Sequence, residues 1–181
     1  MTHDELCTRA VRWLRWSMRC NPVFDNVASC AEVPDAIGWS SKYNVRGSVV
    51  VECKASRTDF YRDKTKVVRW RWPESMHDQV YDGSRVRKMS RKQAEVRGLI
   101  ETKLPRMGVY RFYLCERGII TPEMVAGHAP DHGLLIVTGR QIRVARAAPR
   151  RADGDVDLMS EVRLLRFAII NQKPNRSEAC A

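Results

Sequence analysis

Apolar side chains recur at helical spacing near the start of the chain. Thr2 and Glu5 have the spacing of a capping box, and apolar residues then return every three or four positions as far as Met18. This pattern predicts an amphipathic helix over residues 3–19. The Asn21-Pro22 pair should end this helix, because proline cannot continue one.

The apolar runs that follow are short and rich in β-branched residues, which is typical of strands. Brief strands are predicted at 26–33 and 35–39, separated by Pro34, because proline cannot donate to a β-ladder. Three consecutive valines, beginning at Val49, predict a buried strand over residues 47–55.

The rest of the chain alternates helical and extended patterns. Ser56, with Asp59 three residues later, is a good N-cap for a further helix. The elements expected from there on are a helix from Ser56 to about Lys66, a basic helix at 88–103, a strand at 109–115, a hairpin of strands at 133–137 and 142–147, and a helix at 155–170.

This order of elements predicts an α/β (α+β) fold in which helices flank a mixed β-sheet. A chain of 181 residues has room for one domain with a real core and not for two full ones. We therefore expect a single domain over residues 1–170, followed by a flexible tail at 171–181.

The net charge of the chain indicates which kinds of partner the protein binds. The chain has 32 Lys and Arg against 21 Asp and Glu, a net charge of +11, which favours a polyanion such as nucleic acid, an anionic membrane surface or an acidic protein. No apolar run reaches the roughly 18 residues that a transmembrane helix needs, and the first residues lack the layout of a signal peptide. We therefore expect no membrane partner and a cytoplasmic protein whose six cysteines are thiols rather than disulfides.

Much of the positive charge lies between Lys54 and Arg106, a stretch with 15 basic and 7 acidic residues. Such dense basic clusters favour contact with a nucleic-acid backbone. Trp70 and Trp72 alternate with arginines, so their rings either stack on bases or bury in the core. The residues expected to bind nucleic acid are Arg57, Lys64, Lys66, Arg69, Arg71, Arg85, Arg87, Lys88, Arg91 and Lys92.

A possible metal centre follows from the charges beside the valine run. Glu52 and Lys54 are two residues apart on a predicted strand, so their side chains share one face while Cys53 points to the other. Two charges on a buried strand are costly unless a divalent cation and a phosphate compensate them. Asp35 begins a neighbouring predicted strand and can supply a second carboxylate, and a backbone carbonyl, that of Cys53, completes an oxygen-rich set suited to Mg²⁺.

These residues resemble the motif of the PD-(D/E)xK nuclease superfamily. The resemblance rests on Pro34-Asp35, on Glu52-Cys53-Lys54 and on the run from Ala55 to Lys64, and is similar to the small MmcB-like and phage-encoded branch. It implies a restriction-endonuclease-like core and Mg²⁺- or Mn²⁺-dependent cleavage of phosphodiesters, in the host cytoplasm for a phage-encoded member.

The resemblance also assigns roles to single residues. It implies that Asp35 and Glu52 are metal ligands and that Lys54 is the catalytic lysine. Glu5 would be an auxiliary acid, a role for which Glu32 competes because it lies three residues before Asp35. The basic stretch at about 65–106 is longer than a minimal core needs, so it is expected to be an insertion that grips the substrate.

Two kinds of function remain open on the sequence. The first is a DNA endonuclease, for which RNA is an alternative substrate and a homodimer one arrangement for cutting both strands. The second is a nuclease-like fold that binds nucleic acid or inhibits a protein partner with little or no turnover. An intact set of Asp35, Glu52 and Lys54 favours the enzyme, because an inactive site has no physical reason to keep three costly charges.

Overall fold

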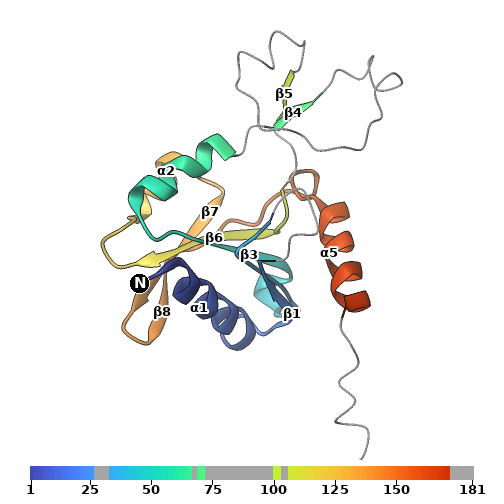
Figure 1. Ribbon diagram of the computed structural model, residues 1–181, viewed down its shortest axis with the longest axis horizontal. Helices are drawn as coiled ribbons and strands as arrows, with labels where there is room; N and C mark the ends of the chain where they lie inside the picture. The colour runs from blue at the N-terminus through green and yellow to red at the C-terminus, as the bar shows by residue number, and fades with distance from the viewer. Residues whose placement is uncertain (27–32, 67–68, 72–99, 103–105, 172–181) are drawn as a thin grey trace, which may run out of the picture. The chain divides into compact units, whose positions relative to one another are not determined.

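The computed structural model describes residues 1–26, 33–66, 69–71, 100–102 and 106–171 (Figure 1). The chain divides into two compact units, one formed by Met1–Phe60 with Pro105–Ala181 and the other by Tyr61–Leu104. The first unit contains the large sheet and the candidate site. The insertion expected at about 65–106 overlaps the second unit.

The first unit is built on a six-stranded mixed sheet with the strand order β1-β2-β3-β6-β7-β8. Strand β3 pairs parallel with β6, and β6 pairs parallel with β7, whereas the outer pairs are antiparallel. The strands are β1 (Cys20–Asp25), β2 (Ala36–Ser40), β3 (Gly47–Cys53), β6 (Tyr110–Glu116), β7 (His132–Thr138) and β8 (Gln141–Arg146). With its flanking helices, this sheet makes the fold α/β (α+β), as expected.

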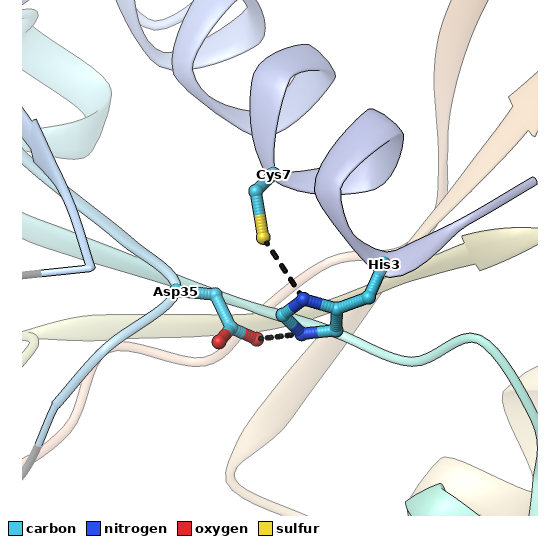
Figure 2. Close-up of side chains that lie close together, drawn as sticks. All are labelled: His3, Cys7 and Asp35. Atoms are coloured by element: carbon cyan, nitrogen blue, oxygen red, sulfur yellow. Dashed lines mark hydrogen bonds and ion pairs between the residues drawn. The ribbon is translucent and has the colours of Figure 1, made fainter.

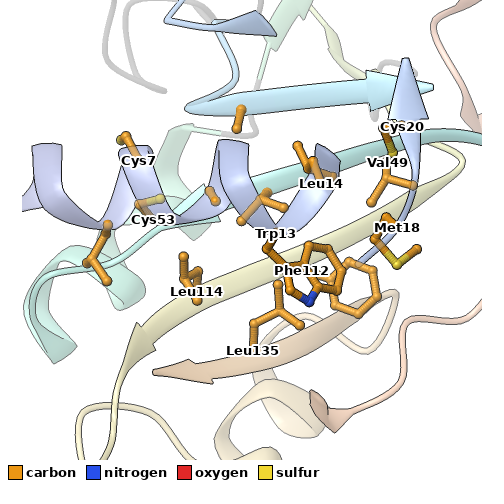
Figure 3. Close-up of a cluster of buried hydrophobic side chains, with 14 of the residues drawn as sticks. Cys7, Trp13, Leu14, Met18, Cys20, Val49, Cys53, Phe112, Leu114 and Leu135 are labelled. Carbon is orange, nitrogen blue, oxygen red and sulfur yellow. The ribbon is translucent and has the colours of Figure 1, made fainter. Parts of the chain in front are cut away.

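Helix α1 (His3–Trp16) covers one face of the sheet. Thr2 and Glu5 form both hydrogen bonds of the predicted capping box. Leu6 and Leu14 are fully buried in one cluster with strand residues such as Val49, and Figure 3 shows Leu14 of α1 and Val49 in this layer, with the helix running across the strands. Because full burial of a leucine contributes about 1.5–3 kcal/mol, this packing is enough to hold the helix on the sheet.

Three helices contribute to the opposite face. Val50 and Tyr113 point there, because their neighbours along β3 and β6 belong to the α1 face. Leu164 of α5 (Leu158–Asn171) packs with Val50. Val125 of α4 (Pro122–His128) packs with Tyr113, and so does Phe60 near the start of α2 (Arg57–Lys66).

A buried carboxylate fastens α5 to the sheet. Glu161 Oε1 accepts hydrogen bonds from Ser48 Oγ at 2.7 Å and from the Gly108 N–H at 2.8 Å, and its Oε2 accepts from Trp39 Nε1 at 3.2 Å. These bonds compensate for burying the carboxylate, because they replace hydrogen bonds to water that burial removes. The helix is therefore fixed where β2 and β3 run side by side.

The second unit contains the end of α2 and a two-stranded antiparallel ladder of β4 (Arg69–Arg71) and β5 (Ile100–Thr102). The helix predicted at 88–103 is therefore wrong at residues 100–102, where pairing with β4 holds the backbone extended. The rest of that prediction lies outside the described residues, as does the tail from residue 172.

Most other predicted elements are present with shifted ends. The hairpin is confirmed as β7 and β8, with Gly139 at φ +58° in its turn, a conformation that glycine adopts without strain. Helix α1 stops at Trp16 instead of residue 19, because Arg19 has a positive φ of 53° and the chain turns into β1.

One strand and one α-helix of the first unit were not predicted from the sequence. Strand β1 contains Pro22, which suggested only a helix stop, and the ladder shifts register beside it. Proline is tolerated there because β1 lies at the edge of the sheet. Helix α4 is short and has Thr121 as its N-cap and Pro122 in its first turn.

Among the described residues, no helix has both the length and the apolar character needed to cross a membrane. The four cysteines in this part of the chain, Cys7, Cys20, Cys53 and Cys115, are free thiols, as expected.

Candidate active site

Asp35 lies immediately before β2 and reaches across to the end of β3. Its Oδ2 accepts a hydrogen bond from the backbone N–H of Cys53 at 2.7 Å. Cys53 is the residue between Glu52 and Lys54, so the antiparallel pairing of β2 with β3 brings all three predicted residues to one end of these strands. Two segments 18 residues apart in sequence are thereby joined by a carboxylate.

Glu52 and Lys54 lie on the face of the sheet opposite Cys53, as predicted from their spacing. Both are buried, with 8% and 2% of their surface exposed. Glu52 Oε1 is 3.0 Å from a terminal nitrogen of Arg111, and Lys54 Nζ lies 5.6 Å from the centre of the Tyr113 ring. Cys53 instead packs with α1.

Arg111 on β6 is a central residue of this face that sequence reasoning missed. It is completely buried and its guanidinium bonds three groups, namely Glu52, the Met107 carbonyl and His132 Nε2. Because its Nε donates to His132 Nε2 at 3.2 Å, that ring nitrogen is the acceptor and Nδ1 carries the proton. Nδ1 donates to Asp131 Oδ1 at 2.8 Å. A continuous polar chain therefore runs from Glu52 across β6 to β7.

The Tyr113 ring joins the catalytic candidates to this chain. It stacks on the His132 ring with 4.6 Å between centroids and meets Phe60 edge-on at 5.1 Å. The ring is 2% exposed and lies between Lys54 and the imidazole. Its face attracts the Lys54 ammonium and replaces part of the hydration that burial removes.

Burial lowers the pKa of His132 to about 4 from its ordinary 6.5, an effect that the bond to Asp131 only partly offsets. The unfolded chain binds a proton near pH 6.5 and the folded chain only near pH 4, so acid favours unfolding between these values. We therefore expect the titration of His132 to lower the free energy of unfolding by about 3 kcal/mol as the pH falls from 6.5 to 4. Urea unfolding at several pH values measures this loss.

The variant His132→Gln is the control for the pH experiment, because its amide has no proton to gain in this range. It should lose clearly less stability than the natural chain between pH 6.5 and 4. Equal losses in the two proteins would show that other groups cause the acid sensitivity.

The residue of α1 that reaches Asp35 is His3, and not Glu5. His3 Nε2 lies 3.3 Å from Asp35 Oδ2, and its Nδ1 lies 3.5 Å from Cys7 Sγ (Figure 2). Glu5 is exposed, and its carboxylate accepts from the Thr2 N–H at 2.7 Å. Two residues along a helix turn the Glu5 side chain well away from the face that carries His3, so Glu5 caps the helix in this structure, and its role as an auxiliary acid stays a prediction. Glu32 lies outside the described residues.

Cys7 and Cys53 form a pair of buried thiols beside Asp35. The interaction of the two thiols lowers the pKa of Cys7 and raises that of Cys53, and burial adds to the rise for Cys53. One thiol belongs to α1 and the other to β3, so the pair lies where the helix meets the end of the strand (Figure 3).

The predicted nucleic-acid contacts fall mostly beyond this region. Arg57 is exposed, but it donates to the carbonyls of Ile119 and Gly118 at 2.9 and 3.1 Å and so fastens the turn after β6. Lys64 and Lys66 belong to α2, and Arg69 and Arg71 to β4. The predicted contacts outside the described residues are Arg85, Arg87, Lys88, Arg91 and Lys92, together with Trp72.

A basic groove that the sequence did not reveal lies between α1 and the β7–β8 hairpin. It has a volume of about 620 Å³ and is lined by Arg9, Arg12, Trp13, Trp16, Ser17, Arg140, Gln141 and Ile142. Trp16 is 79% exposed there. Arg9 donates to the Gly139 carbonyl at 2.7 Å and ties the helix to the hairpin turn. The two sides of the groove come from segments about 130 residues apart, so no local sequence pattern predicts the groove.

Comparison with known proteins leaves the family open. No family model matches the chain, and no curated protein does. Among solved structures, the chain is similar to the SPO1766 protein of unknown function from Silicibacter pomeroyi, with 18% sequence identity and a TM-score of 0.48. The similarity covers 94% of this chain and 86% of that one.

Proposed function

We propose that this protein is a metal-dependent nuclease that hydrolyses phosphodiester bonds of DNA. The observation that carries the proposal is the hydrogen bond from the Cys53 N–H to Asp35, because it brings an acidic residue from one strand to the Glu52–Lys54 segment of the next. The same motif underlies the resemblance to the PD-(D/E)xK superfamily. We also propose that the sheet of the first unit and its helices form a restriction-endonuclease-like core.

The donors at this end of the strands fit Mg²⁺ or Mn²⁺ by their chemistry. Asp35 and Glu52 supply carboxylate oxygens, and the carbonyl of Cys53 is a further hard donor. Asp35 is partly open to solvent, with 17% of its side chain exposed. A bound divalent ion would lower the pKa of a coordinated water and neutralise charge on the phosphate.

The chain's own residues would do the rest. Lys54 places a buried positive charge where a phosphate gains negative charge, which lowers the barrier because the ammonium is already oriented and desolvated. Arg111 holds Glu52 in position through the ion pair at 3.0 Å. Water would bond to phosphorus and lose a proton to solvent, and the P–O bond to the leaving sugar oxygen would break while that oxygen takes a proton from a second water.

The basic groove supports a nucleic-acid substrate. Three arginines line it, namely Arg9, Arg12 and Arg140, and they can neutralise phosphates. The exposed Trp16 ring offers a face on which a base can stack, a contact worth about 1–3 kcal/mol. The net charge of +11 also attracts the negatively charged nucleic acid over a longer range.

The test is incubation of the purified chain with linear, circular and branched DNA in Mg²⁺, Mn²⁺ or EDTA. We expect cleavage with either metal ion and none in EDTA, and cutting of circular DNA would identify an endonuclease. Asp35→Asn is the matched variant, because its amide oxygen can still accept from Cys53 while the metal-binding charge is lost. No cleavage of any substrate with either ion would reject the proposal.

A second candidate function is nucleic-acid binding without cleavage. It is favoured by Glu52, whose Oε1 is already engaged by Arg111, and by the groove, which needs no metal ion to bind phosphates. Salt-dependent DNA affinity together with no cleavage in the same assay would identify this function. Equal affinity for an acidic control protein would instead point to a protein partner.

A further inference from the structure

Three residues of different chemistry converge where α1 meets the start of β2. One ligand atom from each of His3, Cys7 and Asp35 lies within 4.8 Å of the others. His3 and Cys7 are four residues apart on α1 and therefore share a face. Asp35 is held in place by the Cys53 N–H. Figure 2 shows the imidazole between the thiol and the carboxylate.

A fourth donor adjoins this cluster. The Cys53 thiol lies beside the Cys7 thiol, and it comes from the end of β3 rather than from the helix. Both thiols are buried, with 3% and 1% exposure, whereas the His3 side chain is 43% exposed. The cluster therefore has a closed side made of sulfur and an open side at the imidazole, through which an ion can enter.

The composition of the cluster selects a particular class of ion. Thiolate and imidazole are soft or intermediate donors that suit Zn²⁺ and Co²⁺, whereas Mg²⁺ prefers an all-oxygen set. Four side chains, two with sulfur, one with nitrogen and one with oxygen, form the number and type of ligands found in closed tetrahedral zinc sites.

The spacing is close to what such an ion needs. With bonds of about 2.0–2.3 Å, neighbouring ligand atoms of a tetrahedral site lie roughly 3.3–3.8 Å apart. His3 Nε2 to Asp35 Oδ2 is 3.3 Å, and His3 Nδ1 to Cys7 Sγ is 3.5 Å. These two distances involve different nitrogens of the ring, so the half-exposed imidazole has to turn to present one nitrogen to an ion held with Cys7 and Asp35, whose ligand atoms lie within 4.8 Å of one another and of His3.

We propose that His3, Cys7, Cys53 and Asp35 form a Zn²⁺ site that joins α1 to β2 and β3. The site would add metal–ligand bonds to the apolar packing that holds the helix, so binding is expected to stabilise the fold.

This site is separable from the proposed nuclease centre. Asp35 is common to both sets, but Cys7 and His3 belong only to the zinc site, and Glu52 and Lys54 only to the nuclease centre. Zinc binding can therefore be measured whether or not the chain cleaves DNA.

The experiment is a Co²⁺ titration of the untagged, full-length, reduced chain, followed by displacement with Zn²⁺. We expect thiolate-to-cobalt charge-transfer absorption and tetrahedral visible bands that saturate at about one ion per chain. Cys7→Ser and His3→Gln should each weaken Zn²⁺ binding by at least about 100-fold in competition with a chromophoric chelator. Glu52→Gln should leave it unchanged.

Cys115→Ser is the matched control, because Cys115 is an equally buried thiol on the opposite face of the sheet. Circular dichroism shows which variants fold. If Cys7→Ser does not fold, His3→Gln decides, because its half-exposed side chain can be replaced without opening the core. Absence of the thiolate band in the natural chain, or an unchanged band and affinity in the folded variants, would overturn the proposal.

Discussion

Replacing Lys54 with methionine is expected to lower the rate of Mg²⁺-dependent DNA cleavage by at least about 100-fold, while the chain stays folded. The ammonium is 2% exposed and lies over the Tyr113 ring, so it is already desolvated and oriented before substrate binds. Methionine has a similar length and no charge, so it fills the same space and removes only the electrostatic contribution. The measurement is the single-turnover rate on a labelled DNA.

The control for this prediction is Lys42→Met. Lys42 is a partly buried lysine elsewhere in the same unit, and its Nζ donates to the Ser17 carbonyl at 2.6 Å. Its replacement should leave cleavage within about twofold, since Asp35 precedes the start of β2 whereas Lys42 follows the opposite end of that strand. Undiminished cleavage by Lys54→Met would remove this lysine from the mechanism.

Replacing Arg111 with methionine is expected to reduce the free energy of unfolding by about 3–5 kcal/mol. The guanidinium is completely buried and bonds Glu52, His132 and the Met107 carbonyl. Removing it leaves the Glu52 carboxylate buried without this counter-charge and removes the donor to the imidazole. Urea unfolding at pH 7 measures the loss.

A double-mutant cycle isolates the ion pair. Glu52→Gln combined with Arg111→Met should recover part of the lost stability, because the buried charge that Arg111 had paired is then removed as well. Arg143→Met on β8 serves as the exposed control and should change stability by less than about 0.5 kcal/mol. If Arg111→Met costs no more than this control, the buried network does not stabilise the fold.

Local spacing was enough to predict how Glu52 and Lys54 are arranged. Side chains two residues apart on a strand share a face, and the valine run before them marked the strand as buried. The shared face and the burial of the strand both follow from neighbouring residues, so the sequence was enough to predict them. The capping box at Thr2 and the hairpin around Gly139 were predictable for the same reason.

The partners of these residues were decided by the tertiary structure. Arg111 meets Glu52 because β6 pairs parallel with β3, and these residues are 59 positions apart. Nothing near Arg111 in the sequence distinguishes it from the chain's other arginines. Only strand order and register determine that its guanidinium is buried beside a carboxylate.

The same distinction holds at the two sites on α1. The sequence by itself determined that α1 is amphipathic and that His3 and Cys7 share a helical face, because helical periodicity depends only on spacing along the chain. That this face meets Asp35 and Cys53, and that Trp16 meets the hairpin at Arg140, depended on how the helix docks on the sheet. Docking is set by the summed packing of the whole core, which no short segment contains.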